Sequence, residues 1–402
     1  MEQGRAKIEW AASHMPLLAG LRREFGREQP FRGRRIAMSI HLEAKTACLA
    51  LLLRDGGARV AVTGSNPLST QDDVARALAV ENDIEVYARR GASPEEYTGH
   101  LREALAIRPD LVLDDGGDLV DVLHLDSMHG ILGGCEETTT GVARLRRRAH
   151  RGELAFPMFA VNDARMKCLF DNRFGTGQSV WDAVLRSTNL LVAGKSVVIA
   201  GYGWCGRGIA LRARGLGAHV TVTEVDPVKS LEAMMDGFLV APMREAIQSA
   251  DFVVTATGCI DVVSGDDIAV AKDGALLANA GHFNVEINLD HLSRWTQTTR
   301  AVRPGIVEHT LTDGRRVYLL GEGRLVNLVL GDGHPVEIMD ISFALQALTL
   351  QHIASHPALP PGLYSVPEEV DLDVARRALE ARGASIDTWT EAQRAYMSPD
   401  AA

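Results

Sequence analysis

The chain lacks a membrane-spanning segment, because no apolar run approaches the roughly 18 residues that such a helix needs. It shows no signal-peptide pattern, no internal repeat and no low-complexity segment. Its five cysteines are odd in number and lack the paired spacing of a metal site, so we expect free thiols and no metal. These are Cys48, Cys135, Cys168, Cys205 and Cys259. We therefore expect a cytoplasmic protein with no membrane partner.

The chain also lacks an excess of positive charge. Its formal net charge of −10 argues against nucleic acid as the main partner. The 46% apolar and 23% charged residues are typical of a globular protein. A length of 402 residues favours two or three domains.

One stretch in the middle of the chain carries the most specific pattern. A β-branched apolar run at 197–200 leads into Gly201-Tyr202-Gly203-Trp204-Cys205-Gly206, and a helical stretch follows at 207–214. A second strand is expected at 218–223 and ends at Glu224. Strand, Gly-x-Gly-x-x-Gly, helix, strand and acid in this order predict a dinucleotide-binding unit.

Each part of this unit has a physical role. Gly201 permits a tight turn, Gly203 lets the backbone approach a pyrophosphate, and Gly206 lets the helix pack closely on the strand. The helix N-terminus offers free N–H groups to the phosphates. Glu224 lies where a carboxylate accepts from a ribose hydroxyl and repels a 2′-phosphate, which favours NAD over NADP.

Before this unit the chain alternates strands and helices. Strands are expected at 34–40, 59–63, 85–87 and 111–113, and polar clusters follow them at 41, 66–72 and 114–118. An amphipathic helix is expected at 7–25, broken or kinked by Pro16. Alternation of this kind predicts a parallel sheet whose polar clusters meet at the carboxyl ends of the strands.

After the unit, further buried strands are expected at 252–256, 275–280 and 317–320, and an apolar helix at 336–353. Glycine-rich segments at 175–177 and 333–335 look like hinges. We therefore predict an α/β fold of two doubly wound parallel-sheet (Rossmann-like) lobes joined by two hinges. The substrate lobe would comprise 1–174 with 334–360, the NAD lobe 175–333, and a helical, oligomerising tail 361–402. Two crossings suggest a cleft that opens and closes.

With these residues placed, the chain resembles the S-adenosylhomocysteine hydrolase family over nearly its whole length. The resemblance rests on the strings SIHLEAKTA, NPLSTQDD, LDDGGDL, EETTTGV, NDARMKCLFDN, AGYGWCGRG, TEVDP, TATGCID, NAGHFNVEI, EGRLVNL and GHP. The tail is similar to that of the shorter archaeal and thermophile-type members. It lacks the Lys-rich, Tyr-ending tail with which longer members reach a neighbour's cofactor.

The resemblance implies a redox-assisted elimination in one-carbon metabolism, within the methyl cycle. Tightly held NAD would oxidise the 3′-hydroxyl of the nucleoside, and the resulting ketone would acidify the hydrogen at C4′. Loss of that proton would expel the 5′ substituent; water addition and re-reduction would complete the hydrolysis. Family members are usually tetramers, so a homo-oligomer (tetramer or dimer) is expected.

The same resemblance implies the site residues. Lys167 matches the base near the 3′-oxygen, a role that requires burial and neighbours to lower its pKa, and Asp171 would orient it. A plain i, i+4 ion pair is the alternative for these two. Asp115 and His41 match the groups near C4′ and the leaving atom. The implied catalytic set is His41, Asp115, Glu137, Lys167, Asp171, Asn172 and His282.

Two further sets are implied. The substrate-binding set is Glu43, Lys45, Asn66, Ser69, His334, Met339 and Phe343. The cofactor-binding set is Thr138, Thr139, Thr140, Gly201, Gly203, Trp204, Cys205, Gly206, Glu224, Asn279, Gly281, His282 and Asn327.

Four positions depart from the family pattern. Lys45 replaces a Gln or Glu that reads the 6-amino group of adenine; a lysine only donates, which suits a 6-keto purine and suggests an S-inosylhomocysteine substrate, unless Lys45 points into solvent. Asn284, Gly321 and Leu345 replace the usual Asp, Ala and Asn, and Leu345 could lie beside the ligand. Altered packing on the 5′ side leaves open a nucleoside dehydratase that releases the 4′,5′-ene. A catalytically silent NAD-binding regulator is the alternative of another class.

Overall fold

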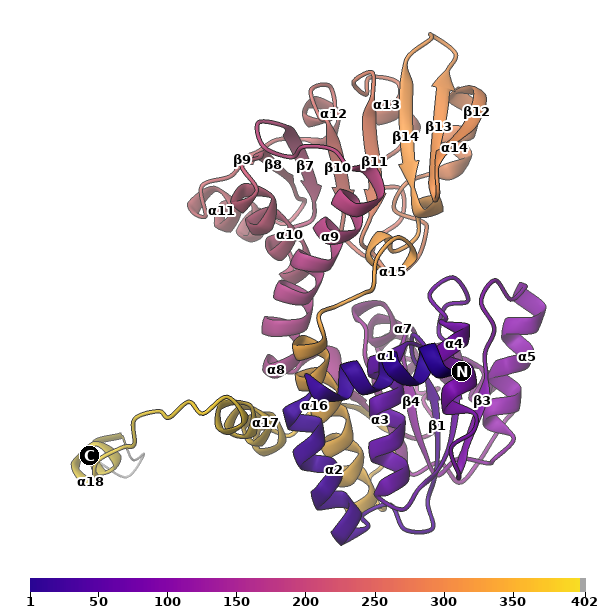
Figure 1. Cartoon of the computed structure of the whole chain (residues 1–402). Helices are drawn as coiled ribbons and strands as arrows, with labels where there is room; N and C mark the ends of the chain where they lie inside the picture. The colour runs from indigo at the N-terminus through magenta and orange to yellow at the C-terminus, as the bar shows by residue number, and fades with distance from the viewer. Residues whose placement is uncertain (398–402) are drawn as a thin grey trace.

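The chain folds into two α/β lobes, seen one above the other in a computed structural model that describes residues 1–397 (Figure 1). Each lobe is a sheet of mostly buried strands with helices on its faces. The expected fold class of two doubly wound lobes is therefore confirmed. Within the described residues no helix combines the length and the apolar character needed to cross a bilayer.

The lower lobe holds a seven-stranded, all-parallel sheet in the order β15-β6-β5-β4-β1-β2-β3. Its strands are β1 (Arg35–Ser39), β2 (Arg59–Thr63), β3 (Ile84–Tyr87), β4 (Leu111–Asp114), β5 (Gly133–Glu136), β6 (Pro157–Ala160) and β15 (Gly362–Ser365). Its helices are α1 (Glu2–Ser13), α2 (Pro16–Glu28), α3 (Ala44–Asp55), α4 (Asp72–Leu78), α5 (Pro94–Leu105), α6 (Asp118–Leu125), α7 (Thr139–His150), α8 (Arg165–Lys167), α16 (Val336–Ser355) and α17 (Glu368–Ala381), with a 3₁₀ turn at η1 (Val161–Asp163).

The upper lobe holds an eight-stranded sheet in the order β12-β13-β14-β11-β10-β7-β8-β9. Its strands are β7 (Ser196–Ala200), β8 (His219–Thr223), β9 (Leu239–Val240), β10 (Phe252–Thr255), β11 (Ala275–Asn279), β12 (Thr296–Arg303), β13 (Ile306–Leu311) and β14 (Arg316–Leu320). Its helices are α9 (Thr176–Thr188), α10 (Trp204–Gly215), α11 (Pro227–Met235), α12 (Met243–Ala246), α13 (Gly265–Ile268), α14 (Leu289–Trp295) and α15 (Val326–Val329), with a 3₁₀ turn at η3 (Gly321–Gly323).

Three features differ from the sequence-based expectation. Strands β5, β9, β12 and β13 were not predicted, and the last two make the edge of the upper sheet antiparallel. The tail is not purely helical, because β15 pairs with β6 and completes the lower sheet. The first glycine-rich crossing is helical: a π-helical segment, η2 (Cys168–Gly175), runs directly into α9, so Gly175 and Gly177 serve close packing rather than a loop. A Cβ on Gly177 would lie 2.7 Å from the Gly208 carbonyl oxygen.

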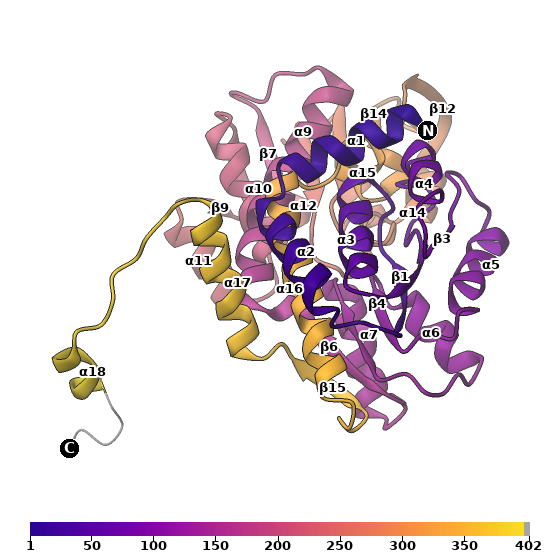
Figure 2. The same ribbon diagram turned by 60° about the horizontal axis from the view of Figure 1, so that its bottom comes forward.

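Both crossings meet beside α16. This helix returns from the upper lobe and is buried in the lower one against α2, α3 and α17 (Figure 2). Beyond α17 the chain runs away from the body to the short helix α18 (Glu391–Met397), a course that both ribbon views show (Figures 1 and 2).

The tail helix α17 stabilises the segment that carries Lys167. The Asp371 carboxylate accepts from the N–H groups of Arg165 and Met166 at 3.1 and 2.9 Å, where α8 begins. We expect Asp371→Ala to lower the free energy of unfolding by about 1–2 kcal/mol, since two N–H groups lose their partner. Urea denaturation measures it. Glu369→Ala, an exposed acid two residues earlier on the same turn, should change it by less than about 0.5 kcal/mol. Equal effects of the two variants would contradict the assignment.

Candidate active site

A cleft of about 1420 Å³ lies between the lobes, at the carboxyl ends of both sheets. In the lower sheet the strand order reverses between β1 and β4, and His41 and Asp115 follow these two strands. In the upper sheet it reverses between β7 and β10, and Gly201 and Thr257 follow those. Such switch points are where open α/β sheets bind ligands. The volume exceeds the roughly 300–1,000 Å³ of a single small-molecule site, so two ligands fit side by side.

The upper half of the cleft has the geometry of a dinucleotide site. Gly201 has φ +94°, and a Cβ on Gly206 would lie 1.9 Å from the Gly201 carbonyl oxygen, so both positions require glycine. At Gly203 a Cβ would meet open space, and α10 begins at the next residue. The helix N-terminus therefore faces a region that can hold phosphates.

Two polar groups complete this half. Glu224 lies at the end of β8; its carboxylate accepts from the Tyr202 N–H at 2.7 Å and keeps lone pairs for a ribose hydroxyl. Asn327 donates to Ser179 Oγ at 3.1 Å, while its buried Oδ1 has no hydrogen-bond partner among the described residues. A buried carbonyl oxygen without a partner fits a ligand amide such as nicotinamide. These residues fit NAD.

A buried lysine stands at the centre of the lower half. Lys167 Nζ donates to Asp171 Oδ1 at 2.8 Å and Asn172 Oδ1 at 2.7 Å, and lies 3.3 Å from Glu137 Oε1. All three ammonium protons therefore have an acceptor. The i+4 and i+5 partners are both in reach because the chain is π-helical from Cys168 onward.

The electrostatics of this group differ from the expectation for Lys167. Burial alone would lower the pKa of Lys167, but the carboxylates of Asp171 and Glu137 outweigh it and hold that pKa above its ordinary value. The lowered pKa that a lysine base requires is therefore not present here, and Lys167 is an ammonium ion. Burial raises the pKa of Glu137 to about 7, although Lys167 opposes the shift. Asp171 is held ionised by Lys167 and His334, which lower its pKa despite burial.

A second cluster lies at the lobe interface. His41 Nε2 is 3.4 Å from Asp115 Oδ2, and His282 Nδ1, from the upper lobe, is 3.9 Å from Asp115 Oδ1. Ser69 Oγ is 2.6 Å from His41 Nδ1, and burial lowers the pKa of His41. Asp115 Oδ1 is buried without a hydrogen-bond partner in the described part of the chain. The three side chains can thus pass a proton to or from a ligand between the lobes.

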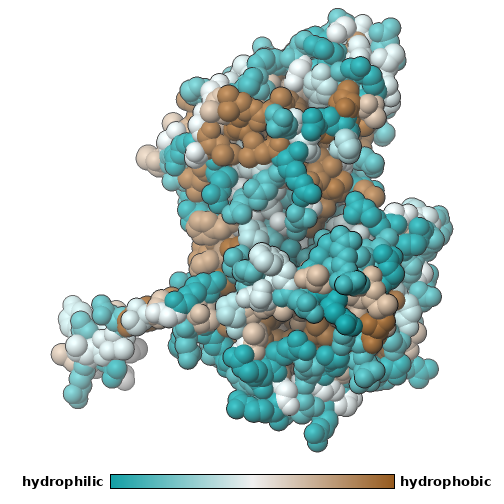
Figure 3. All heavy atoms as spheres, viewed as in Figure 1, coloured by the Kyte–Doolittle hydropathy of each residue, from teal (hydrophilic) through white to brown (hydrophobic). Residues whose placement is uncertain are grey.

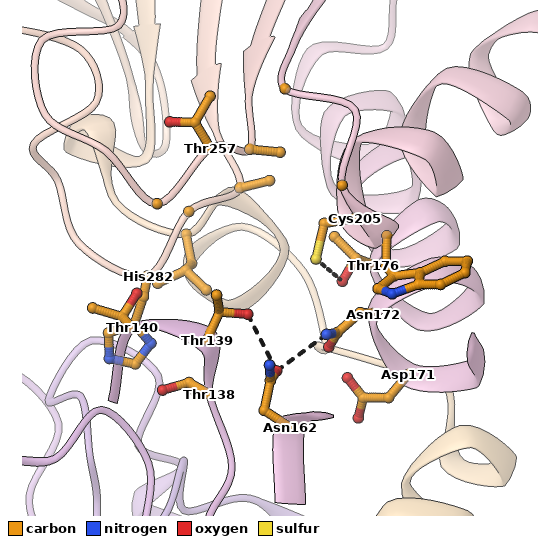
Figure 4. A pocket seen from close by; sticks show the side chains of 18 of the residues that line it. Thr138, Thr139, Thr140, Asn162, Asp171, Asn172, Thr176, Cys205, Thr257 and His282 are labelled. Carbon is orange, nitrogen blue, oxygen red and sulfur yellow. Dashed lines mark hydrogen bonds between the residues drawn. The ribbon is translucent and has the colours of Figure 1, made fainter. Parts of the chain in front are cut away.

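Figure 4 shows the polar groups between these clusters. Asn162 Oδ1 accepts from Thr139 Oγ1 at 3.2 Å and from Asn172 Nδ2 at 3.1 Å, so one amide joins the threonine run to the lysine group (Figure 4). Thr176 Oγ1 is 3.6 Å from Cys205 Sγ, which places the glycine loop against the start of α9 (Figure 4). His334 Nδ1 lies 3.2 Å from Asp171 Oδ1.

The cleft brings together most of the residues expected from the sequence. It is lined by His41, Glu43, Lys45, Asp115, Glu137, Thr138, Thr139, Thr140, Lys167, Asp171, Asn172, Gly201, Gly203, Trp204, Cys205, Glu224, Gly281, His282, Asn327, His334, Met339 and Phe343. Four expected residues do not line it: Asn66, Ser69, Gly206 and Asn279. Asn279 is fully buried, and its amide bonds to the loop at Gly281, Phe283 and Gly323, so it shapes the loop beside the cleft.

Two other expectations change. Leu345 is fully buried in the apolar core of the lower lobe and does not reach the ligand space. Lys45 does not point into solvent: only 8% of its side chain is exposed, and its Nζ lies 3.0 Å from Glu43 Oε2 and donates to the Asp332 carbonyl at 3.1 Å.

Sequence reasoning missed several supporting residues. On α16, Ser342 Oγ donates to Asp171 Oδ2 at 2.8 Å, and Gln346 Nε2 donates to Glu137 Oε2. In the upper lobe, the buried Glu286 accepts from the N–H groups of Thr257 and Gly258 at 2.9 and 2.8 Å, and so holds the turn that follows β10. Only polar residues inside an otherwise apolar helix could have signalled the first two.

Comparison with known proteins identifies the family of this chain. The family model described as S-adenosyl-L-homocysteine hydrolase matches residues 1–129, and the one described as its NAD binding domain matches residues 172–333. Adenosylhomocysteinase from Thermotoga maritima is 55% identical over 401 residues, 99% of each chain. S-inosyl-L-homocysteine hydrolase from Methanocaldococcus jannaschii is 52% identical over 400 residues, 98% of this chain and 96% of that protein.

Among solved structures, the A chain of dipicolinate synthase from Bacillus subtilis aligns with a TM-score of 0.49 at 12% identity, over 81% of this chain and 98% of that one. This likeness is too weak to bear on the activity. The sequence matches extend over nearly the whole chain and include both halves of the cleft. The chain therefore belongs to the S-adenosyl-L-homocysteine hydrolase family and carries its NAD-binding domain.

Proposed function

We propose that this chain hydrolyses S-adenosyl-L-homocysteine reversibly to adenosine and homocysteine, with NAD as its resident cofactor. The observation that supports this most is the position of the buried Lys167–Asp171–Glu137 group in the same cleft as the dinucleotide loop. The bound NAD supplies reversible hydride transfer at C3′ of the sugar. The protein must then move two protons, one at the 3′-oxygen and one at C4′.

The Lys167 group handles the first proton. Lys167 is an ammonium ion, whereas Glu137, 3.3 Å away, has a pKa of about 7. We assign the pair one shared role: Lys167 donates to the 3′-oxygen and stabilises negative charge on it, while Glu137 takes up the released proton. Asp171 and Asn172 keep the lysine in place.

Asp115 and His41 handle the second proton. With C3′ at the ketone level the C4′ hydrogen is acidic, and Asp115 Oδ1 is free to accept it. His41 begins the reaction as a neutral imidazole, because burial lowers its pKa. Asp115 is 3.4 Å away and passes the proton to His41, which gives it to the departing 5′ atom. Water addition reverses these transfers.

S-inosyl-L-homocysteine is the second candidate substrate, favoured by the position of Lys45. Two of its three ammonium donors are used by Glu43 and the Asp332 carbonyl, which leaves one for the purine. A 6-keto purine would place an acceptor opposite Lys45 and the N1–H donor opposite Glu43, whereas a 6-amino purine reverses the two. A curated relative of this chain is named for that activity.

The other candidate functions find less support. The dehydratase hypothesis relied on altered packing beside the 5′ substituent, but Asn284, Gly321 and Leu345 do not line the cleft. A silent regulator would have lost part of the proton-transfer set, and all of it is present.

We also propose a homo-oligomer, acting in the cytoplasm within the methyl cycle. The upper lobe shows an apolar patch in the space-filling view (Figure 3), and exposed Leu191, Val225, Val228, Met235 and Leu239 all belong to this lobe. We expect sedimentation equilibrium to give a mass of two or four chains, and a single-chain mass would contradict the proposal.

The products decide between the candidate reactions. We expect purified protein to retain NAD and to release homocysteine with adenosine or inosine from the matching thioether, as mass spectrometry would detect. A product lighter than the nucleoside by one water would identify a dehydratase, and retained NAD without turnover a regulator.

Substitution of Lys45 tests which of the two purine substrates the site prefers. We expect Lys45→Gln to lower kcat/KM on the inosyl thioether about tenfold or more, because a charged hydrogen bond is lost, and to change the adenosyl value far less. Arg54→Gln, at the far end of α3, is the matched control and should change neither. Equal losses on both thioethers would remove Lys45 as a determinant.

The raised pKa of Glu137 predicts that the rate of NADH formation depends on pH. A carboxyl accepts a proton only when ionised, so we expect NADH formation from adenosine to rise with pH up to about 7 and then level off. Glu137→Gln should lower the rate about 10²-fold and abolish this rise. Asp340 is also buried, with a pKa raised to about 6, but lies outside the cleft; Asp340→Asn should keep the rise. A rise that persists in Glu137→Gln would contradict the role.

A further inference from the structure

Two buried carboxyls lie side by side behind the active site and have no part in the proposed chemistry. Asp114 ends β4 and Glu136 ends β5, and they are directly opposite each other in the parallel register. Their exposures are 1% and 0%. Within residues 1–397 their hydrogen-bond partners are backbone N–H groups and one hydroxyl, none of them a cation. Burying two adjacent acids without a cation costs free energy, so we expect the pair to have a role in the structure or the reaction.

Glu136 joins two loops of the cleft through a single atom. Its Oε1 accepts from the Gly116 N–H at 2.9 Å and from the N–H and Oγ1 of Thr138 at 2.9 and 2.8 Å. Asp114 adds a bond from the Asp115 N–H at 3.0 Å and one from the Val120 N–H at 2.8 Å. The first loop presents Asp115, and the second presents the threonine run Thr138–Thr140.

The packing around Glu136 leaves room for its carboxyl group. A Cβ on Gly141 would lie 2.1 Å from the Glu136 carboxyl carbon. Residue 141, in the first turn of α7, must therefore lack a side chain for the carboxyl to fit. Gly116 has φ +108°, and a Cβ there would lie 2.5 Å from His282 Nε2 of the other lobe. The turn that Glu136 holds is therefore also the place where the lobes meet.

We propose that Glu136 is a positioning residue, whose one acceptor oxygen fixes the Asp115–Gly116 turn relative to the Thr138 turn and so aligns the group that works at C4′ with the threonines at the nicotinamide end. This rests on the proposed function. Burial raises the pKa of Asp114 to about 7, and burial with the charge of Asp114 raises that of Glu136 well above its usual range. The contacts of Oε1 with both turns therefore assign the role to the reach of Glu136 and not to its charge.

Two substitutions in the NAD-loaded protein separate the effect of side-chain length at position 136 from the effect of its charge. Glu136→Gln keeps the reach and an acceptor oxygen, whereas Glu136→Asp keeps the carboxyl but withdraws it by about 1.5 Å. We expect kcat of Glu136→Gln to stay within about threefold of the wild type. We expect kcat of Glu136→Asp to fall about 10²-fold with little change in KM, because misplacement by about 1 Å costs that much.

Three further measurements follow each variant: C4′ hydrogen exchange in D₂O, NAD retained after gel filtration, and the thermal midpoint. We expect Glu136→Asp to lose C4′ exchange and to release NAD faster than Glu136→Gln. Asp340→Asn is the matched control, since Asp340 also accepts from two backbone N–H groups, of Leu17 and Leu18, outside the cleft. It should lower only the thermal midpoint.

The opposite order, with Glu136→Asp more active than Glu136→Gln, would show that charge is needed and would overturn the proposal. If Glu136→Asp and Asp340→Asn lose the same fraction of kcat for the same drop in thermal midpoint, Glu136 has only a structural role. That result would also overturn the proposal. Failure of the proposed function would be distinct, because the wild type itself would then show no NADH formation and no C4′ exchange.

Discussion

The site depends on one buried cation, Lys167, held between the carboxylates of Asp171 and Glu137. Burial in a low dielectric disfavours any charge, so an ammonium ion persists here only because two acids lie within 3.3 Å of it. Those acids are held in turn by Ser342 and Gln346, which come from α16, about 170–210 residues later in the chain. A helix that returns from the upper lobe thus completes the hydrogen bonds of these two acids. The activity and the two-lobe fold are linked through this contact.

The two sheets bring different chemistry to one cleft. Each sheet reverses its strand order once, and the loops after the reversal points face each other across the cleft. The lower sheet supplies the groups to which we assign proton transfer, and the upper sheet supplies the dinucleotide loop. His282, from the upper lobe, reaches Asp115 only because Gly116 has no side chain. The relative position of the lobes therefore decides whether His282 lies beside Asp115.

Sequence patterns were sufficient where local chemistry dominates. The glycine loop, the strands β1 to β4 and the break at Pro16 follow from patterns that act over a few residues. The antiparallel strands β12 and β13 were missed because the exposed strand β12 has no apolar alternation to reveal it. Strand β15 was missed because its pairing with β6 joins segments about 200 residues apart.

By itself, the sequence determined the fold class, the NAD site and the family, since these depend on glycine positions, apolar periods and long shared strings. Tertiary structure alone decided the electrostatics and the supporting contacts. The base role of Lys167 required a lowered pKa, and that pKa is instead raised, because both acids lie beside its ammonium group in space. Leu345 proved to be core, Lys45 faces the cleft, and Glu136 holds two loops at once. Burial and partners at long sequence separation set each of these, and no local pattern encodes them.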